Sequence, residues 1–172
     1  HPLRRWYIGV QHRKVTRFEQ RCFSWADAAT AVSAEDTRHI AALNPKLAVQ
    51  TIENGVDTGY FAPSEHSSSP CSIVFTGAMD WRPNQDGVCW FVGDVLPRIR
   101  RQLPEVHLTI VGRNPPAHIM ALRQPGIAVT GTVEDVRPHV SAATLCVVPL
   151  RIGGGSRLKI LEALSMQKVV VS

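Results

Sequence analysis

The sequence predicts an α/β fold with a doubly wound parallel sheet, and three observations lead to this prediction. From residue 72 onward, short apolar runs alternate with stretches of helical apolar spacing, the order expected of βαβ units. Three of these runs are closed by a glycine: Gly77, Gly112 and Gly131. A strand, a glycine loop, a helix and another strand follow one another over residues 145–171. Several loops should therefore converge at the carboxyl edge of the sheet, where such folds bind ligands.

The composition is that of a globular protein with an affinity for anions. The chain has 172 residues, of which 44% are hydrophobic and 19% charged, and its net charge is +5. Such a charge suits nucleotide sugars, lipid phosphates or an anionic membrane face. The basic residues are spread along the chain, so nucleic acid is not an expected partner. The chain starts without methionine and stops at Ser172 after an apolar run, so we expect a piece of a longer protein.

Cysteine and histidine patterns give no support for a metal centre. The four cysteines are far apart and form no CxxC pair, which is typical of reduced cytosolic thiols rather than of a zinc site or a disulfide framework. The seven histidines show neither HxxxH nor HExxH spacing. No metal ligands are predicted.

The first 25 residues are basic and are predicted to form an amphipathic helix. Val15, Phe18, Cys22 and Trp25 recur at the spacing of one helical face. We expect this face to pack on a core. A helix lying on a membrane surface is the alternative.

Residues 27–62 predict a strand, a helix, a second strand and a turn. The first strand covers 27–33, and Ser33 then caps a helix with Asp36 at the capping-box position. The second strand covers 47–52. Residues 58–70 contain proline and serine and are interpreted as a linker.

Strands and helices alternate in the remainder of the chain. Residues 78–86 are predicted to form a loop. The predicted strands are 72–76, 106–111, 127–130, 145–148 and 168–171. The predicted helices are 87–103, 117–123, 134–143 and one that starts after Ser156.

The glycine loop before the last helix is a candidate phosphate site. Gly153, Gly154 and Gly155 let a ligand approach the backbone without Cβ atoms in the way. Ser156 fits the N-cap position of the helix that follows. The first N–H groups of a helix lack intrahelical partners and carry partial positive charge, which suits a phosphate.

Lys159 and Glu162 share one face of this helix, opposite most of its leucines. A cation and a carboxylate beside a phosphate-binding loop indicate a ligand that carries both an anion and hydroxyl groups. The alternative interpretation is a surface turn with a solvated Lys–Glu pair.

Six stretches, in this order, carry a family resemblance. They are Ala26-Asp27-Ala28 with Val32-Ser33; Asn54-Gly55-Val56-Asp57 with Tyr60, Phe61 and Pro63; residues 75–81 with Pro83-Asn84; Val111-Gly112; residues 131–133 with Asp135; and residues 153–163. With them the chain resembles the family-four retaining glycosyltransferases of the GT-B fold, and is most similar to the bacterial sugar-transferase branch linked to exopolysaccharide synthesis.

This resemblance implies two Rossmann-like domains that face each other across a cleft. Residues 1–62 would be the C-terminal part of the N-terminal acceptor domain, and 63–71 the linker. Residues 72–172 would be the donor-binding domain, truncated at its C-terminus.

The implied reaction transfers a sugar from a nucleoside-diphosphate sugar with retention, in exopolysaccharide or cell-envelope glycan synthesis. No cofactor and no metal would be needed, and the acceptor would be a glycan or a lipid-linked molecule. The implied location is cytoplasmic, with the inner face of the membrane as an alternative. The piece alone is expected to be inactive.

The resemblance also implies roles for individual residues. Glu162 would hydrogen-bond the ribose hydroxyls, and Lys159 would neutralise the diphosphate as it leaves. Arg157 would assist or would be surface charge, and Trp81 is interpreted as a packing residue. The other implied donor-binding residues are Gly77, Arg82, Asn84, Gly131, Thr132, Val133, Gly154, Gly155, Ser156 and Leu158.

The chain departs from the family pattern at two places. The family often has a glutamate eight positions before the one matched by Glu162, where this chain has Gly154. Pro83-Asn84 stand where many members have a basic residue. Two other functions remain open: a non-enzymatic α/β module that binds an anion or a protein, and a nucleotide-sugar epimerase of the same architecture.

Overall fold

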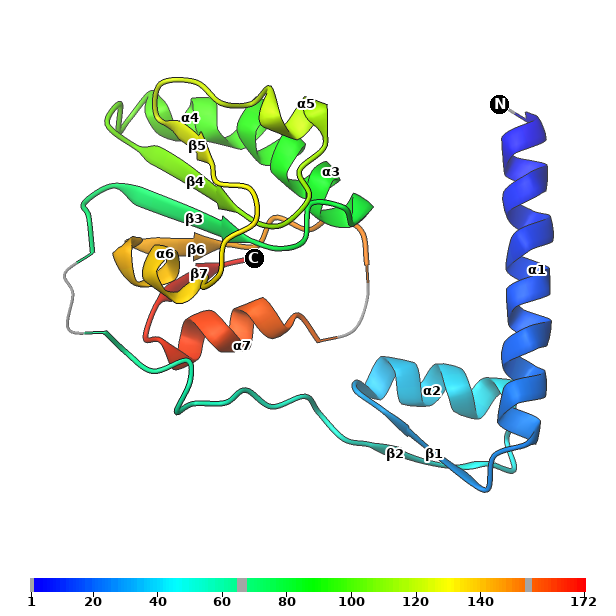
Figure 1. The fold of residues 1–172 in the computed structure, drawn as a ribbon. Coiled ribbons are helices and arrows are strands. Elements are labelled where there is room, and N and C mark those ends of the chain that lie inside the picture. The colour runs from blue at the N-terminus through cyan, green and yellow to red at the C-terminus, as the bar shows by residue number, and fades with distance from the viewer. Residues whose placement is uncertain (1, 65–67, 154–155) are drawn as a thin grey trace. The chain divides into compact units, whose positions relative to one another are not determined.

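The protein is described by a computed structural model covering residues 2–64, 68–153 and 156–172. Contacts within the chain divide it into two compact units, residues 1–54 and 55–172. Figure 1 shows both units, and each is described separately below. Among the helices of the described residues, none combines the length and the apolar character needed to cross a membrane.

The first unit contains the four elements predicted for it. In chain order they are α1 (Pro2–Ser24), β1 (Ala28–Ala31), α2 (Ala34–Leu43) and β2 (Ala48–Thr51). The two strands pair in parallel. The predicted cap of α2 is confirmed, because the Ser33 hydroxyl accepts a hydrogen bond from the Asp36 N–H at 3.1 Å and donates one to the Asp36 carboxylate at 2.6 Å.

The prediction that α1 packs on a core is wrong for the described residues. None of its residues is buried, and the side chains of Trp6 and Phe18 are among its exposed large apolar groups. The helix contacts α2 near its carboxyl end, where Asn44 Nδ2 donates to the Phe23 carbonyl at 3.0 Å. Helix α1 has 23 residues. The small unit formed by α2 and the strands β1 and β2 is too short to cover its apolar face.

The second unit is a five-stranded parallel sheet with strand order β5-β4-β3-β6-β7. This confirms the predicted doubly wound sheet. Its strands are β3 (Ser72–Thr76), β4 (His107–Val111), β5 (Ile127–Val129), β6 (Leu145–Val147) and β7 (Val169–Val171). Its helices are α3 (Arg82–Trp90), the π-helix η1 (Phe91–Val95), α4 (Leu96–Arg100), α5 (Ala117–Met120), α6 (Arg137–Ala142) and α7 (Leu158–Ser165).

Helices lie on both faces of this sheet (Figure 1), and each face carries one apolar cluster. One joins Ile73 and Phe75 of β3 to the α3–α5 side, and the other joins Val74 to α6 and α7. Alternate residues of a strand point to opposite faces, so the central strand β3 supplies both clusters. A parallel strand buried on both sides is expected to be a continuous apolar run, as this one is.

Two helix starts differ from the prediction. Residues 82–86 were expected in a loop, but α3 begins at Arg82 and has Pro83 in its first turn. The fixed φ of proline suits a first helical turn. Ser156 was expected to cap the last helix, but α7 begins at Leu158, with Arg157 at the N-cap and no side-chain cap.

Residues 55–62 belong to the second compact unit, whereas the sequence grouped them with the first domain. Phe61 packs against the cluster of α6 and α7. Its carbonyl accepts a hydrogen bond from the Ser165 hydroxyl of α7 at 2.6 Å. These contacts place this stretch against the side of the sheet that α6 and α7 cover.

The loops after β3 and β4 approach each other closely. Gly77 N–H donates to the Val111 carbonyl at 2.9 Å. A Cβ atom on Gly112 would lie 1.8 Å from the Gly77 carbonyl oxygen. Only glycine fits at residue 112 with this backbone path, and its missing side chain lets the two strand ends approach at the edge where open α/β sheets bind ligands.

We expect Gly112→Ala to lower the free energy of unfolding by about 2 kcal/mol or more, because the added methyl group meets backbone that cannot move aside. Gly93→Ala is the matched control, since its Cβ meets nothing within 4 Å. Urea denaturation of both variants measures the difference. Equal unfolding free energies would contradict the close approach.

Candidate functional site

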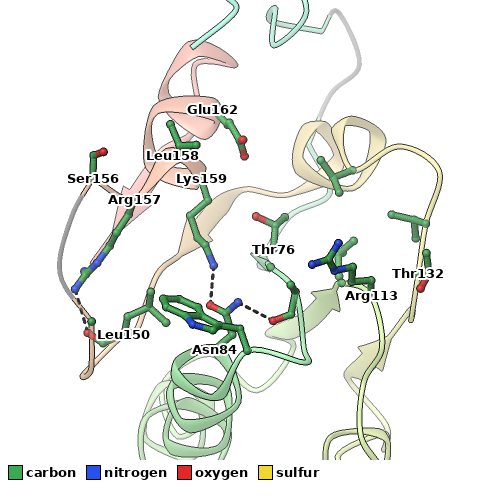
Figure 2. A pocket seen from close by; sticks show the side chains of 18 of the residues that line it. Thr76, Asn84, Arg113, Thr132, Leu150, Ser156, Arg157, Leu158, Lys159 and Glu162 are labelled. Carbon is green, nitrogen blue, oxygen red and sulfur yellow. Dashed lines mark hydrogen bonds between the residues drawn. The ribbon is translucent and has the colours of Figure 1, made fainter. Parts of the chain in front are cut away.

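A cavity of about 580 Å³ opens at the carboxyl edge of the parallel sheet. Its walls come from the loops after β3, β4, β5 and β6, from the first turns of α7 and from Phe61. Figure 2 shows the side chains that surround it. This is the edge at which the glycine-closed strands were predicted to converge.

Lys159 lies at the centre of the site and is held in place. Its Nζ donates to Asn84 Oδ1 at 3.0 Å, and Asn84 Nδ2 donates to the Ala78 carbonyl at 2.8 Å (Figure 2). The same Nζ lies 4.3 Å from the centroid of the Phe75 ring. A Cβ on Gly77 would lie 2.6 Å from Nζ. The missing side chain at residue 77 therefore makes room for the amine.

Glu162 follows one turn later on α7 and lines the same cavity (Figure 2). Its side chain is partly buried. Its carboxylate forms no hydrogen bond or ion pair with any residue that the structure describes. An acceptor-only group in this position is available to hydroxyl donors of a ligand.

Burial shifts the pKa values of both groups. Desolvation lowers the pKa of Lys159 to about 8, with the Glu162 charge opposing this shift and Arg157 adding to it. Desolvation raises the pKa of Glu162, and the positive charge of Lys159 opposes that shift. At neutral pH the Lys159 amine is therefore largely charged but close to its pKa. A bound anion would stabilise this charged form.

Three cations and one carboxylate line the cavity among the described residues: Arg113, Arg157, Lys159 and Glu162. Arg157 Nη1 donates to the Ser172 hydroxyl at 3.0 Å, and Nη2 lies 3.4 Å from the Leu150 carbonyl. The excess of positive charge suits a ligand that carries more than one negative charge.

The structure brings most of the predicted site residues together. Gly154 and Gly155 lie outside the described residues. Arg82 is exposed and does not line the cavity. Gly131 does not line it either, but its carbonyl accepts the Gly112 N–H at 3.3 Å and so shapes the wall. The predicted residues that line the cavity are Gly77, Asn84, Thr132, Val133, Ser156, Arg157, Leu158, Lys159 and Glu162.

Sequence reasoning missed several lining residues, of which Arg113 and Trp81 are the most informative. Arg113 directly follows Gly112 at the end of β4. This position in the sequence could have identified it as a residue that lines the ligand edge of the sheet. Its Nε lies 3.5 Å from Asp80 Oδ2. Trp81 was interpreted as a packing residue, but it is 49% exposed at the cavity. A Cβ atom added to Gly153 would lie 3.5 Å from the Trp81 ring.

The described residues contain no group of three His, Cys, Asp or Glu side chains that could hold a metal ion.

Comparison with known proteins gives a family and a fold. A family model described as "Glycosyl transferases group 1" matches residues 70–172. No curated protein matches the sequence.

Three solved structures illustrate the structural similarity. A TarM variant of S. aureus, in complex with fondaparinux, alpha-GlcNAc-glycerol and UDP, has a TM-score of 0.75 at 13% identity over 91% of this chain and 32% of that one. Sucrose-phosphate synthase of Thermosynechococcus elongatus has a TM-score of 0.71 at 19% identity, over 92% and 43%. Anabaena HepE, in complex with UDP and glucose, has a TM-score of 0.64 at 13% identity, over 90% and 47%.

These similarities show a fold shared with the C-terminal Rossmann-like domain of GT-B glycosyltransferases. The chain spans less than half the length of each of these structures.

We expect the amine of Lys159 to titrate near pH 8 in the folded chain, because burial disfavours its charged form. NMR titration of the lysine side-chain carbons measures it, and Lys159→Arg identifies the signal by its loss. In Lys159→Met, the pKa of Glu162 should rise further, because the opposing charge is gone. An unchanged Glu162 titration in that variant would show that the two groups do not interact.

Proposed function

This chain belongs to the group 1 glycosyl transferases, and we propose on that premise that residues 55–172 bind a nucleoside-diphosphate sugar as the donor for transfer. The observation that carries the proposal is the Glu162 carboxylate, which is partly buried at the cavity and without a hydrogen bond to a described residue. A carboxylate can accept two hydroxyl protons. The paired 2′ and 3′ hydroxyls of a ribose provide such donors.

The diphosphate would lie against Lys159 and the start of α7. Lys159 is three residues before Glu162 on the same helix, so the two reach neighbouring parts of one ligand. Asn84 Oδ1 accepts a hydrogen bond from the amine, which fixes the position of the amine before any ligand binds. A preorganised cation stabilises the negative charge that grows on a departing diphosphate.

The base would occupy the end of the cavity away from the phosphates. Thr132 and Val133 line that end, and Phe61 and Val136 supply further apolar surface. A flat apolar wall suits a nucleobase, which buries its faces and exposes polar edges. The solved structures of S. aureus TarM and Anabaena HepE contain UDP, which makes UDP the first nucleotide to test.

The finer features of the reaction are part of the same proposal. The transfer would retain the anomeric configuration, use a glycan or lipid-linked acceptor and require neither metal nor cofactor. It would serve exopolysaccharide or cell-envelope glycan synthesis, in the cytoplasm or at the inner face of the membrane. Because the chain spans less than half of the structures it matches, turnover is proposed for the whole protein and not for this chain.

We expect the chain to bind at least one of UDP, GDP and ADP, and Glu162→Ala to weaken that binding about 10- to 100-fold, the loss expected for hydrogen bonds to a charged group. Isothermal titration calorimetry measures the affinities. Glu105→Ala is the matched control, because Glu105 lies just before β4, at the opposite edge of the sheet.

Three results would count against this assignment or a part of it. If the folded chain binds none of the three nucleotides, the donor site is rejected. If inorganic pyrophosphate binds as tightly as the best nucleotide, and Lys159→Ala has no effect, the cavity belongs to a general anion-binding module. Unchanged affinity in Glu162→Ala would reject the ribose contact alone.

We expect the affinity for UDP to fall about tenfold between pH 7 and pH 9. Lys159 has a pKa of about 8 in the free chain, so it is largely charged at pH 7 and binding needs no additional proton. At pH 9 it is largely neutral, and the diphosphate loses a cation unless a proton is taken up. Uridine, which lacks phosphates, is the control for ionisation of the base. A parallel loss of uridine affinity would contradict the role of Lys159.

A further inference from the structure

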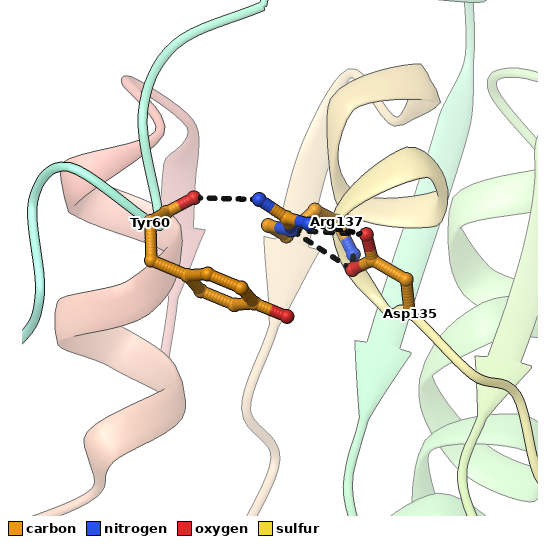
Figure 3. A network of polar contacts seen from close by, with 3 residues as sticks. All are labelled: Tyr60, Asp135 and Arg137. Atoms are coloured by element: carbon orange, nitrogen blue, oxygen red, sulfur yellow. Dashed lines mark hydrogen bonds and ion pairs between the residues drawn. The ribbon is translucent and has the colours of Figure 1, made fainter.

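The guanidinium group of Arg137, at the start of α6, is bound on two sides (Figure 3). Towards Asp135, Nε and Nη2 donate to the carboxylate at 3.0 and 2.7 Å. Towards Tyr60, Nη1 donates to the carbonyl at 3.1 Å. Its Cζ also lies 3.8 Å from the centroid of the Tyr60 ring. One side chain therefore holds both the backbone and the ring of Tyr60.

The anchor for this arrangement is Asp135. One of its oxygens also accepts the backbone N–H of Arg137 at 2.9 Å. These hydrogen bonds from Arg137 keep the pKa of Asp135 below its usual value, so the carboxylate stays charged at neutral pH. A bidentate Arg–carboxylate pair fixes the direction of the guanidinium as well as its position.

The segment that Arg137 holds has no helix or strand of its own. Residues 52–64 are described as turns and irregular backbone. Within it, Asp57 Oδ1 accepts the N–H groups of Gly59 and Tyr60, each at 2.9 Å. The Phe61 N–H donates to the Asp57 carbonyl at 2.8 Å. Among the described residues, no backbone hydrogen bond joins this turn to a strand, and side chains of Arg137 in α6 and Ser165 in α7 bond to its carbonyls.

Phe61, the next residue, reaches the donor cavity. It lines that cavity together with Val133 and Val136. Its carbonyl is held by the Ser165 hydroxyl of α7 at 2.6 Å, and α7 is the helix that carries Lys159 and Glu162. The rings of Tyr60 and Phe61 meet edge to face, with centroids 5.0 Å apart. The contact made by Arg137 is thus transmitted to the cavity wall through two adjacent residues.

We propose that Arg137 is a positioning residue for the donor cavity, which acts by holding Tyr60 so that the Phe61 ring forms one wall of the nucleotide site. The inference rests on the proposed function, since it names the nucleotide as the ligand that this wall contacts. Arg137 itself does not line the donor cavity. Its effect on binding must therefore pass through the segment it holds.

A double-mutant cycle on nucleotide affinity tests this inference. The four proteins are the unmodified chain, Arg137→Ala, Phe61→Ala and the double variant, each titrated with UDP by calorimetry. Each single change should weaken binding about 3- to 10-fold, and the double variant should bind no more weakly than Phe61→Ala. Such non-additivity is expected when one residue acts through another.

Two further variants separate positioning from general stability. Tyr60→Phe keeps the ring and the carbonyl that Arg137 contacts, so it should bind UDP like the unmodified chain. Arg100→Ala removes an arginine that donates to the carbonyls of Val106 and Gly126 at 3.1 and 2.8 Å, away from the cavity. It should lower the melting temperature without changing the affinity. If Arg137→Ala does not fold, Tyr60→Ala takes its place in the cycle.

The outcomes distinguish this inference from the function on which it rests. If the unmodified chain binds UDP and Arg137→Ala binds it equally well, the inference fails and the donor site stands. If the losses of the two single variants multiply in the double variant, Arg137 acts independently of Phe61, and the inference also fails. If the unmodified chain binds no nucleoside diphosphate, both the proposed function and the inference are overturned.

Discussion

The site depends on one hydrogen bond, from the Lys159 amine to Asn84 across the ends of the central strands. It joins α7 to α3, which lie on opposite sides of the parallel sheet, and it holds a cation where burial lowers the pKa to about 8. The bond is possible because Gly77 has no side chain. The neighbouring Glu162 carboxylate is thereby paired electrostatically but left open to a ligand. The contact thus fixes the position of the cation beside an acceptor that a ligand can reach.

The sequence predicted what depends on local pattern. Alternating apolar runs predicted the sheet, and the spacing of Ser33 and Asp36 predicted the helix cap. The helical spacing of Lys159 and Glu162 predicted that they share one face, and both side chains line the cavity. The start of α3 was missed although its signal was present, since Pro83 was interpreted as part of a loop rather than as a first-turn residue. Ser156 was predicted as the N-cap from its residue type. The N-cap is instead Arg157, which makes no side-chain capping hydrogen bond and is not a residue type that marks a cap.

What the sequence could not supply are contacts between residues distant in the chain. Arg137 and Tyr60 are separated by 77 positions, and no periodicity or cap relates them. The same applies to Phe61 and Ser165, which are 104 positions apart. These contacts decide that the stretch after Asn54 belongs with the second unit and contributes an aromatic wall to the cavity. The packing of α1 was misjudged for a similar reason, because an apolar helical face does not identify the surface that covers it.

The most direct test of the central claim is a crystal structure of the chain with UDP bound. The account predicts that the Glu162 carboxylate lies within about 3 Å of a ribose hydroxyl, and that the Lys159 amine contacts the diphosphate at a similar distance. A nucleotide bound elsewhere, or bound in this cavity with its ribose remote from Glu162, would contradict the account.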